Sequence, residues 1–121
     1  MKKASAAFLE VTLEEGWVAR IGRSSLDNDL LTFKESFPQD WWLHAKGCPG
    51  SHVVIHHPSE AEPSKQVLEM SARLALKYSK ARSTGKGTVS VCHIADISKS
   101  RGAPPGQVQL RKSKTLTVYQ H

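Results

Sequence analysis

The sequence has 121 residues, of which 39% are hydrophobic, with two cysteines and a formal net charge of +6. This length predicts one domain, which we take to span residues 1–121. No run of about 18 apolar residues occurs, so no membrane-spanning helix is expected. Cys48 and Cys92 are too few for a disulfide framework. These features predict a monomeric protein of the cytoplasm or of an organelle.

The charge is unevenly distributed along the chain. Residues 1–63 contain six Lys and Arg against nine Asp and Glu, a net charge of −3. Residues 64–121 contain eleven against two, a net charge of +9. A half-chain this basic attracts polyanions if the fold gathers its cations, and otherwise serves solubility alone. We therefore expect a nucleic-acid surface, built mainly from the second half.

Two short strands are expected near the N-terminus, after residues 1–7, which we expect to be disordered. Residues 8–13 and 17–21 are short apolar runs on either side of Gly16. Glycine adopts the positive φ of a tight turn without steric cost. The pattern predicts a hairpin, with Trp17 in the core.

A short helix is expected from about Asp29 to Ser36. Asp27 and Asn28 are both suited to cap it, because a short side-chain oxygen accepts an early helical N–H group. Phe37 precedes a proline, which disfavours the helical region for Phe37 itself. The helix should therefore end before Phe37.

The central stretch, residues 40–57, reads DWWLHAKGCPGSHVVIHH. Residues 41–46 and 52–56 are expected to be strands, joined by a turn that contains glycine and proline. The stretch therefore predicts a β-hairpin, although its register cannot be derived from the sequence.

Side chains alternate between the two faces of a strand. Trp42, His44 and Lys46 should therefore lie on the face opposite to Trp41 and Leu43. We expect one face of this hairpin to be buried and the other to be polar, with aromatic rings and cations exposed on it.

The second half of the chain begins with the main helix. Two start signals compete, namely a capping box of Ser59 with Glu62 and a first-turn proline at Pro63. Apolar residues then recur three and four positions apart, as on one side of a helix. We expect this helix to end near Ser83, because Gly85 suits the position that follows a helix.

Short strands should follow the helix. Residues 88–94 alternate and are rich in β-branched side chains, which favours a core strand. After a loop at 95–106, residues 107–110 and 115–119 are expected to be the last two strands, with 111–114 as the basic tip of a hairpin between them. The predicted fold class is α+β, with an antiparallel or mixed β-sheet packed on one long α-helix and one additional short helix.

His44, Cys48 and His52 are residue types that bind zinc or form activated thiol nucleophiles. Their spacing spans a hairpin turn, the sequence contains no CxxC motif, and no orienting carboxylate can be identified. The alternative is that the two histidines bind nearby backbone groups and orient the turn. We expect no metal, no cofactor and no catalytic residue.

RNA binding requires cations for the phosphates and flat groups for exposed bases. The chain contains both, mostly in the central stretch and in the basic second half. The candidate RNA-binding residues are Arg23, Trp42, His44, Lys46, His52, Arg73, Lys77, Lys80, Arg82, Lys86, Lys99 and Arg101.

Five parts of the sequence resemble the motifs of a known family, in the order of that family. They are Gly22-Arg23 with Asn28-Asp29 and Leu31-Thr32, the central stretch DWWLHAKGCPGSHVVIHH, Tyr78-Ser79-Lys80-Ala81-Arg82, KSRGAPPG at 99–106, and Lys114-Thr115. Together they resemble the NFACT-R domain, and the likeness extends from about Trp17 to the C-terminus.

This resemblance implies a non-catalytic RNA-binding domain of ribosome quality-control proteins, with tRNA or rRNA, and the large ribosomal subunit, as partners. The other domains of those proteins do not fit in this chain, so tail elongation and ribosome anchoring are not implied. The alternative hypothesis is a protein-interaction module that docks on a ribosome-associated or tRNA-modification complex through Trp42 and neighbouring apolar surface.

Overall fold

A six-stranded sheet forms the centre of the computed structural model, which describes residues 8–59 and 61–120. The disorder predicted for residues 1–7 concerns a segment that lies outside the described residues. All neighbouring strands run antiparallel, so the α+β class is confirmed in its antiparallel form. In spatial order the strands are β1 (Leu9–Thr12), β2 (Val18–Ile21), β4 (Val53–His56), β3 (Trp41–Ala45), β5 (Lys86–His93) and β8 (Lys114–Tyr119).

The central stretch forms the expected hairpin, in the middle of the sheet. In the β3–β4 register Trp42 lies opposite Val54, and Leu43 lies opposite Val53. The outer side of β4 pairs with β2 and the outer side of β3 pairs with β5. Both strands therefore have a neighbour on each side, and the hairpin is fixed by the rest of the sheet.

The helix α2 (Lys65–Lys77) packs on one face of this sheet. Its apolar side buries Val67 and Leu76 against Leu43 and Val53, which project from the central hairpin. No helix in residues 8–59 and 61–120 has the length and apolar character that crossing a membrane requires.

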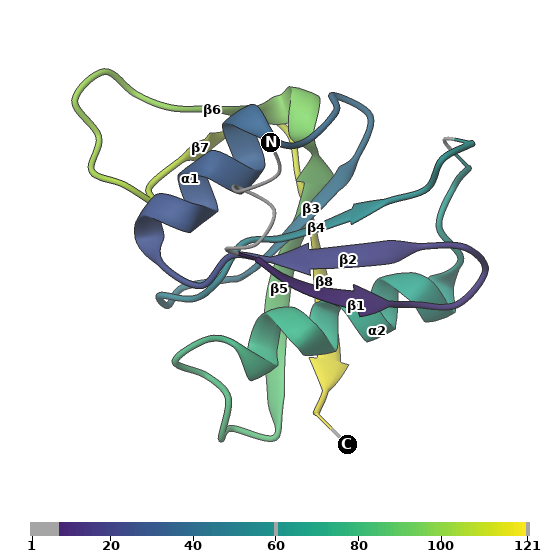
Figure 1. Ribbon diagram of the computed structural model, residues 1–121. Coiled ribbons are helices and arrows are strands. Elements are labelled where there is room, and N and C mark those ends of the chain that lie inside the picture. Colours follow the sequence, from purple (N-terminus) through teal and green to yellow (C-terminus); the bar gives the residue numbers. More distant parts are fainter. Residues whose placement is uncertain (1–7, 60, 121) are drawn as a thin grey trace.

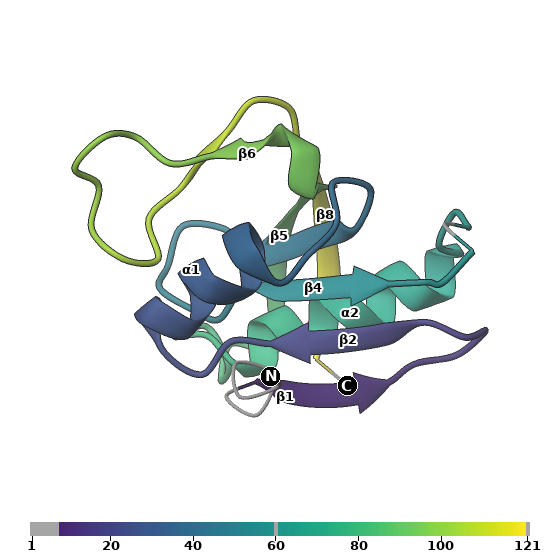
Figure 2. The same cartoon turned by 45° about the horizontal axis from the view of Figure 1, so that its top comes forward.

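A second layer covers the opposite face of the sheet (Figure 1). Trp42, Val54 and Cys92 project to this side and pack with Leu31. Figure 2 shows the helix of this layer and the loop after β6 on the same side, away from α2. The layer consists of α1 (Ser25–Lys34), the 3-10 turn η2 (Ile94–Asp96) and the ribbon of β6 (Ile97–Ser98) with β7 (Gln109–Leu110).

The prediction that one face of the hairpin is polar and exposed is wrong, although the side chains alternate between the two faces as predicted. Trp42 is 2% exposed and His52 is 1% exposed, because α1 and the segment after β5 cover them. Trp41 is partly buried and packs at the edge of the α2 core, and Trp17 is buried as expected.

Both helices begin at a serine that the sequence analysis did not select. Ser24 caps α1 and its Oγ accepts from the Asp27 N–H at 3.1 Å, so α1 starts earlier than expected. Ser64 caps α2 in the same way through Val67, in place of Ser59 or Pro63. In each case the serine accepts an N–H of the first helical turn, which otherwise has no partner.

The end of α2 and the last strands also differ from expectation. α2 ends at Lys77, because Ser79 instead forms a β-bridge with Gly50, and the Ser79 hydroxyl donates to Leu76 O at 2.8 Å. β7 pairs with β6 and β8 pairs with β5, so residues 111–113 connect two sheets and are not a hairpin tip.

Candidate nucleic-acid interface

An open groove of about 890 Å³ lies where α1 begins and α2 ends. Three segments line it, namely residues 23–25 with Asn28, residues 49–51, and residues 77–80 with Arg82. Four of the predicted RNA-binding residues are thereby brought together in what we call the basic groove: Arg23, Lys77, Lys80 and Arg82.

Backbone hydrogen bonds hold two walls of the basic groove together. The Ser51 N–H donates to Tyr78 O at 3.0 Å, and the Lys80 N–H donates to Pro49 O at 2.9 Å. Between them lies the isolated bridge of Gly50 with Ser79. The early end of α2 is therefore what places Lys80 beside the turn after β3.

The N-terminus of α1 forms the third wall. Asn28 fixes this helix to the turn, because its Nδ2 donates to Gly50 O at 3.3 Å and its Oδ1 accepts from the His52 N–H at 3.0 Å. The first N–H groups of a helix lack intrahelical partners and carry a partial positive charge. Ser24 and Ser25 therefore add to the positive potential of the groove.

The cations of the basic groove are exposed and available. Three ion pairs occur among the described residues, and none includes Arg23, Lys77, Lys80 or Arg82. The Arg82 guanidinium donates to Ser79 O at 3.3 Å, which leaves most of its N–H groups free for a ligand. A concave surface with several such charges and no acidic residue among its lining residues favours an anionic ligand.

A second pocket of about 500 Å³ lies beside the basic groove and shares Ser25, Asn28, Pro49 and Gly50 with it. We call it the ring pocket, because Trp42, His44 and His52 line it together with residues 105–108. It is the part of the predicted aromatic surface that remains open to a ligand.

The three rings of this pocket contact one another. The Trp42 and His44 rings are stacked with centroids 5.7 Å apart and an interplanar angle of 16°, and the His52 ring meets both edge-on. His44 is partly buried, whereas Trp42 and His52 are buried. Of the three predicted flat groups, His44 is therefore the one that a ligand can reach directly.

The two histidines are neutral at pH 7. Burial lowers the pKa of His52 to about 4, and the neighbouring His44 shifts it in the same direction. Burial likewise lowers the pKa of His44. His52 Nε2 donates to Gly106 O at 3.2 Å, so Nδ1 is the acceptor for the Thr32 hydroxyl at 2.8 Å.

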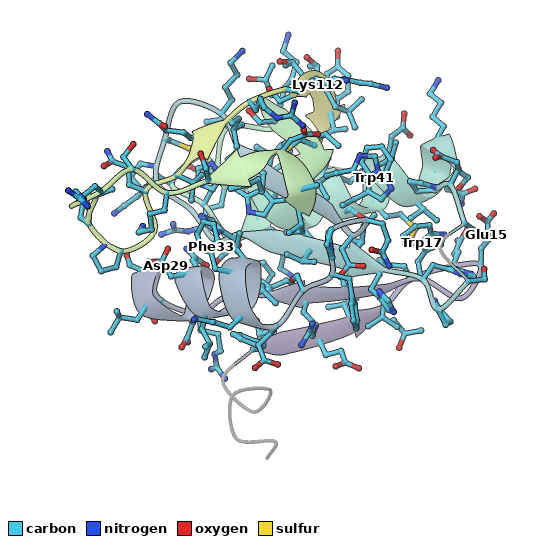
Figure 3. The ribbon with its side chains drawn as sticks, turned by 90° about the horizontal axis from the view of Figure 1, so that it is seen from above. Glu15, Trp17, Asp29, Phe33, Trp41 and Lys112 are labelled. Carbon is cyan, nitrogen blue, oxygen red and sulfur yellow. The ribbon has the colours of Figure 1, made fainter. Side chains whose placement is uncertain are left out.

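The loop after β6 is attached to α1 by Asp29, which lies beside that loop in Figure 3. Its carboxylate accepts from the Gly106 N–H at 3.0 Å and pairs with the Lys99 ammonium at 3.1 Å. Lys99 also donates to Pro104 O and Gln107 O, each at 2.8 Å. The structure thus gives Lys99 a role in shaping the loop, while Arg101 is exposed.

The remaining predicted cations lie near β8, outside the basic groove. Lys46 Nζ donates to Thr115 Oγ1 at 3.3 Å, and Arg73 Nε donates to Tyr119 O at 3.1 Å. Lys86 Nζ lies 6.0 Å from the centroid of the Tyr119 ring. The predicted cations therefore lie in three places: in the basic groove, in the loop after β6, and near β8.

Sequence reasoning missed the backbone part of the groove. Ser24 precedes Asp27 by three residues, a spacing typical of a helix start, so this signal was available. The pairing of residues 49–51 with 78–80 left no comparable signal, because it joins segments that are distant in the sequence.

A comparison with models of protein families shows to which family the chain belongs. The model described as "NFACT protein RNA binding domain" matches residues 7–112. The chain belongs to this family. Its basic groove and ring pocket are therefore features of an NFACT RNA-binding domain.

Curated relatives and a solved structure are similar to this NFACT domain. A protein of Streptococcus suis named "Rqc2 homolog RqcH" is 41% identical over 98 residues, which are 81% of this chain and 17% of that protein. A protein of the same name from Bacillus subtilis is 34% identical over 103 residues, 85% of this chain and 18% of that protein. This chain thus spans less than a fifth of their length.

The solved structure is described as the C-terminal of the fibronectin/fibrinogen-binding protein from Streptococcus suis. It superposes with a TM-score of 0.84 at 36% identity, and the match covers 93% of this chain and 44% of that chain.

The ring pocket of this NFACT domain also contains Cys48, the thiol considered above as a nucleophile. Within the described part of the chain, no hydrogen bond joins Cys48 to His44 or His52, although such a bond activates a thiol. Among the same residues no group of three or more His, Cys, Asp or Glu is arranged to hold a metal ion. Cys92 is buried, which raises its pKa to about 12.

Proposed function

We propose that this NFACT domain binds RNA without catalysing a reaction, and that the basic groove holds the phosphate backbone. The observation that carries the proposal is the meeting of four exposed cations, none of which forms an ion pair with a described residue, with the N-terminus of α1 in one groove. Arginine, lysine and helix N-termini all bind phosphate oxygens, and phosphate contacts supply a large share of the affinity of nucleic-acid-binding proteins.

The relatives support one class of RNA as the ligand. Their name, "Rqc2 homolog RqcH", together with the resemblance to ribosome quality-control proteins, supports tRNA or rRNA as the ligand, with the large ribosomal subunit as a partner in the cytoplasm. A domain that spans 17–18% of those relatives would supply the RNA contact, and other parts of a larger assembly would supply the remaining functions.

The electrostatic test measures the affinity for a fluorescent single-stranded RNA of about eight nucleotides over a range of salt concentrations. If the four groove cations each neutralise one phosphate, log K should fall with log salt at a slope of about −3. A variant with Lys77→Glu, Lys80→Glu and Arg82→Glu should lose at least about tenfold in affinity and have a much flatter slope.

The matched control carries Lys34→Glu, Lys65→Glu and Lys112→Glu, which change the net charge equally at exposed sites outside the groove. It should lose affinity only slightly, through the long-range field. Full affinity in the folded groove variant, or an equal loss in the control, would exclude the basic groove as the site.

A second candidate function is protein docking, because α1 and Phe37 expose apolar side chains. Leu26 is 70% exposed, Phe33 is 37% exposed and Phe37 is 55% exposed. Trp42, which was expected to contribute to such a surface, is buried. Docking through α1 predicts a complex that survives RNase and high salt and is lost in a Leu26→Asp, Phe33→Asp variant.

A further inference from the structure

The ring pocket contains a buried hydrogen-bond donor that the fold does not use. Among the described residues, Trp42 Nε1 is the one buried side-chain nitrogen or oxygen without a partner. Trp42 lines the ring pocket and is 2% exposed. An indole N–H that is buried without a partner costs stability, and buried tryptophans usually find one. Trp42 Nε1 is therefore suited to a ligand that carries an acceptor.

The surroundings of this donor are suited to a flat, uncharged ligand. The His44 and His52 rings are uncharged at neutral pH, since burial lowers the pKa of both. His52 is held on both ring nitrogens by Thr32 and Gly106, whereas the stacked His44 ring is partly exposed. A volume of about 500 Å³ lies within the range of small-ligand sites, which is about 300–1,000 Å³.

The position of the ring pocket beside the basic groove favours the base of a nucleotide as this ligand. The ring pocket and the basic groove share the four residues Ser25, Asn28, Pro49 and Gly50, so the two cavities lie next to each other. A nucleotide has the same division, with a charged phosphate attached to a flat, neutral base that carries acceptors. Proteins that bind unpaired RNA commonly stack splayed-out bases on aromatic side chains and on histidine.

We propose that the ring pocket takes one unpaired nucleobase of an RNA strand whose phosphates lie in the basic groove. The base stacks on the His44 ring, and Trp42 Nε1 donates to an acceptor on the base. Because Nε1 is covered in the free protein, the lining of the pocket has to shift as the base enters. This inference rests on the proposed function and adds the recognition of a base to it.

The test compares two fluorescent probes of equal length and charge, an eight-nucleotide single-stranded RNA and an abasic ribose-phosphate oligomer. Stacking on one aromatic group makes the base-bearing probe bind about 5- to 150-fold more tightly to the native chain. The ratio of the two affinities therefore reports the ring pocket, while the affinity for the abasic probe reports the basic groove.

Two substitutions at His44 distinguish stacking from a structural role. The ratio should fall toward one in His44→Ala and be largely retained in His44→Phe, which keeps a flat ring. Trp42→Phe removes the donor N–H but keeps an aromatic ring, and it should lower the ratio in part. Lys112→Ala, on an exposed site outside both cavities, should keep the native ratio.

Each outcome separates this inference from the proposed function. If both probes bind the native chain equally, the base pocket is excluded while phosphate binding stands. If neither probe binds, both proposals fail. If His44→Ala and His44→Phe weaken the two probes by the same factor, His44 is a structural residue and the base pocket is excluded. Circular dichroism of each variant establishes that it is folded.

Discussion

The two faces of the central sheet differ in chemistry. The face under α2 is an almost entirely aliphatic core, which includes Leu43, Val53 and Leu76. The face under α1 has few buried apolar residues, and it also buries Asn28, Thr32 and His52. One strand pair thus contributes alternate residues to a dry core and to a polar, ligand-accessible side. Under the proposed function, stability and binding are therefore assigned to opposite faces of the same hairpin.

The polar groups on the α1 face have a positioning role. Asn28 joins α1 to the turn at Gly50, and His52 joins α1 to the loop at Gly106. Asp29 attaches the same loop a second time. An aliphatic core does not fix loops with such directional bonds, because the hydrophobic effect has no preferred direction. The α1 face therefore sets the shape of both cavities.

Acid should affect the α1 face most strongly. Folding lowers the pKa of His52 from 6.5 to about 4, through burial and the neighbouring His44, against the opposing effects of Gly106 and Asp29. Between these pH values the unfolded chain binds a proton that the folded chain does not. The free energy of unfolding should therefore fall by about 3 kcal/mol as the pH is lowered from about 6.5 to 4, with no further loss from His52 below that.

Urea unfolding at pH 7.5, 5.5 and 4.5 measures this dependence. A His52→Gln variant keeps hydrogen-bonding capacity without a titratable group, so its stability should depend less on pH, whatever its value at pH 7.5. Equal pH dependence in the two proteins would show that the α1 face does not carry the acid sensitivity.

Val53 and Val54 offer a matched test of the two faces, since they are adjacent, almost fully buried and on opposite sides of the sheet. Replacement of either by alanine removes two methyl groups and should cost about 2 kcal/mol of stability. Val54→Ala should also lower the preference for the base-bearing probe, because Val54 packs with Trp42. Val53→Ala should not, and an equal loss in both variants would contradict the division of roles.

The smallest expected effect is a difference in stability between variants of Lys99 and Arg101, the two cations of the loop after β6. Lys99→Met removes an ion pair and two backbone contacts and should cost about 1 kcal/mol, with little change in the salt slope of RNA binding. Arg101→Met removes the same charge at an exposed site and should leave stability unchanged. If Arg101 contacts a phosphate, its loss should flatten the slope by about 0.7, whereas the same flattening in Lys99→Met would assign the contact to Lys99.

The local features of this fold were predictable from the sequence, and the tertiary ones were not. The two-residue period of a strand places Trp42 and Leu43 on opposite faces, as observed. The burial of Trp42 depends on α1 and on residues 94–110, which lie outside its own strand, so no local pattern reveals it. The end of α2 at Lys77 likewise depends on the bridge from Ser79 to Gly50.

The candidate site likewise has a part that was predictable from the sequence and a part that depends on the tertiary fold. Lys77, Lys80 and Arg82 are close in sequence and were predicted together, and the NFACT-R resemblance included Arg23. That these four surround the start of α1 follows only from the fold. Lys46 was predicted from the alternation of the hairpin strand and from its charge, and Arg73 and Lys86 from the basic second half of the chain. None of these signals specifies that the side chains would lie near β8.

Gly50 has a consequence for how the groove meets its ligand. A Cβ atom at this position would lie 2.6 Å from Ser79 Cβ, so the main chains of the two segments touch where a larger residue would force them apart. Lys80 and Arg82 thus follow a backbone segment whose position is fixed by its contact with the turn. If the groove binds RNA as proposed, this segment need not be ordered on association, and less conformational entropy is lost there.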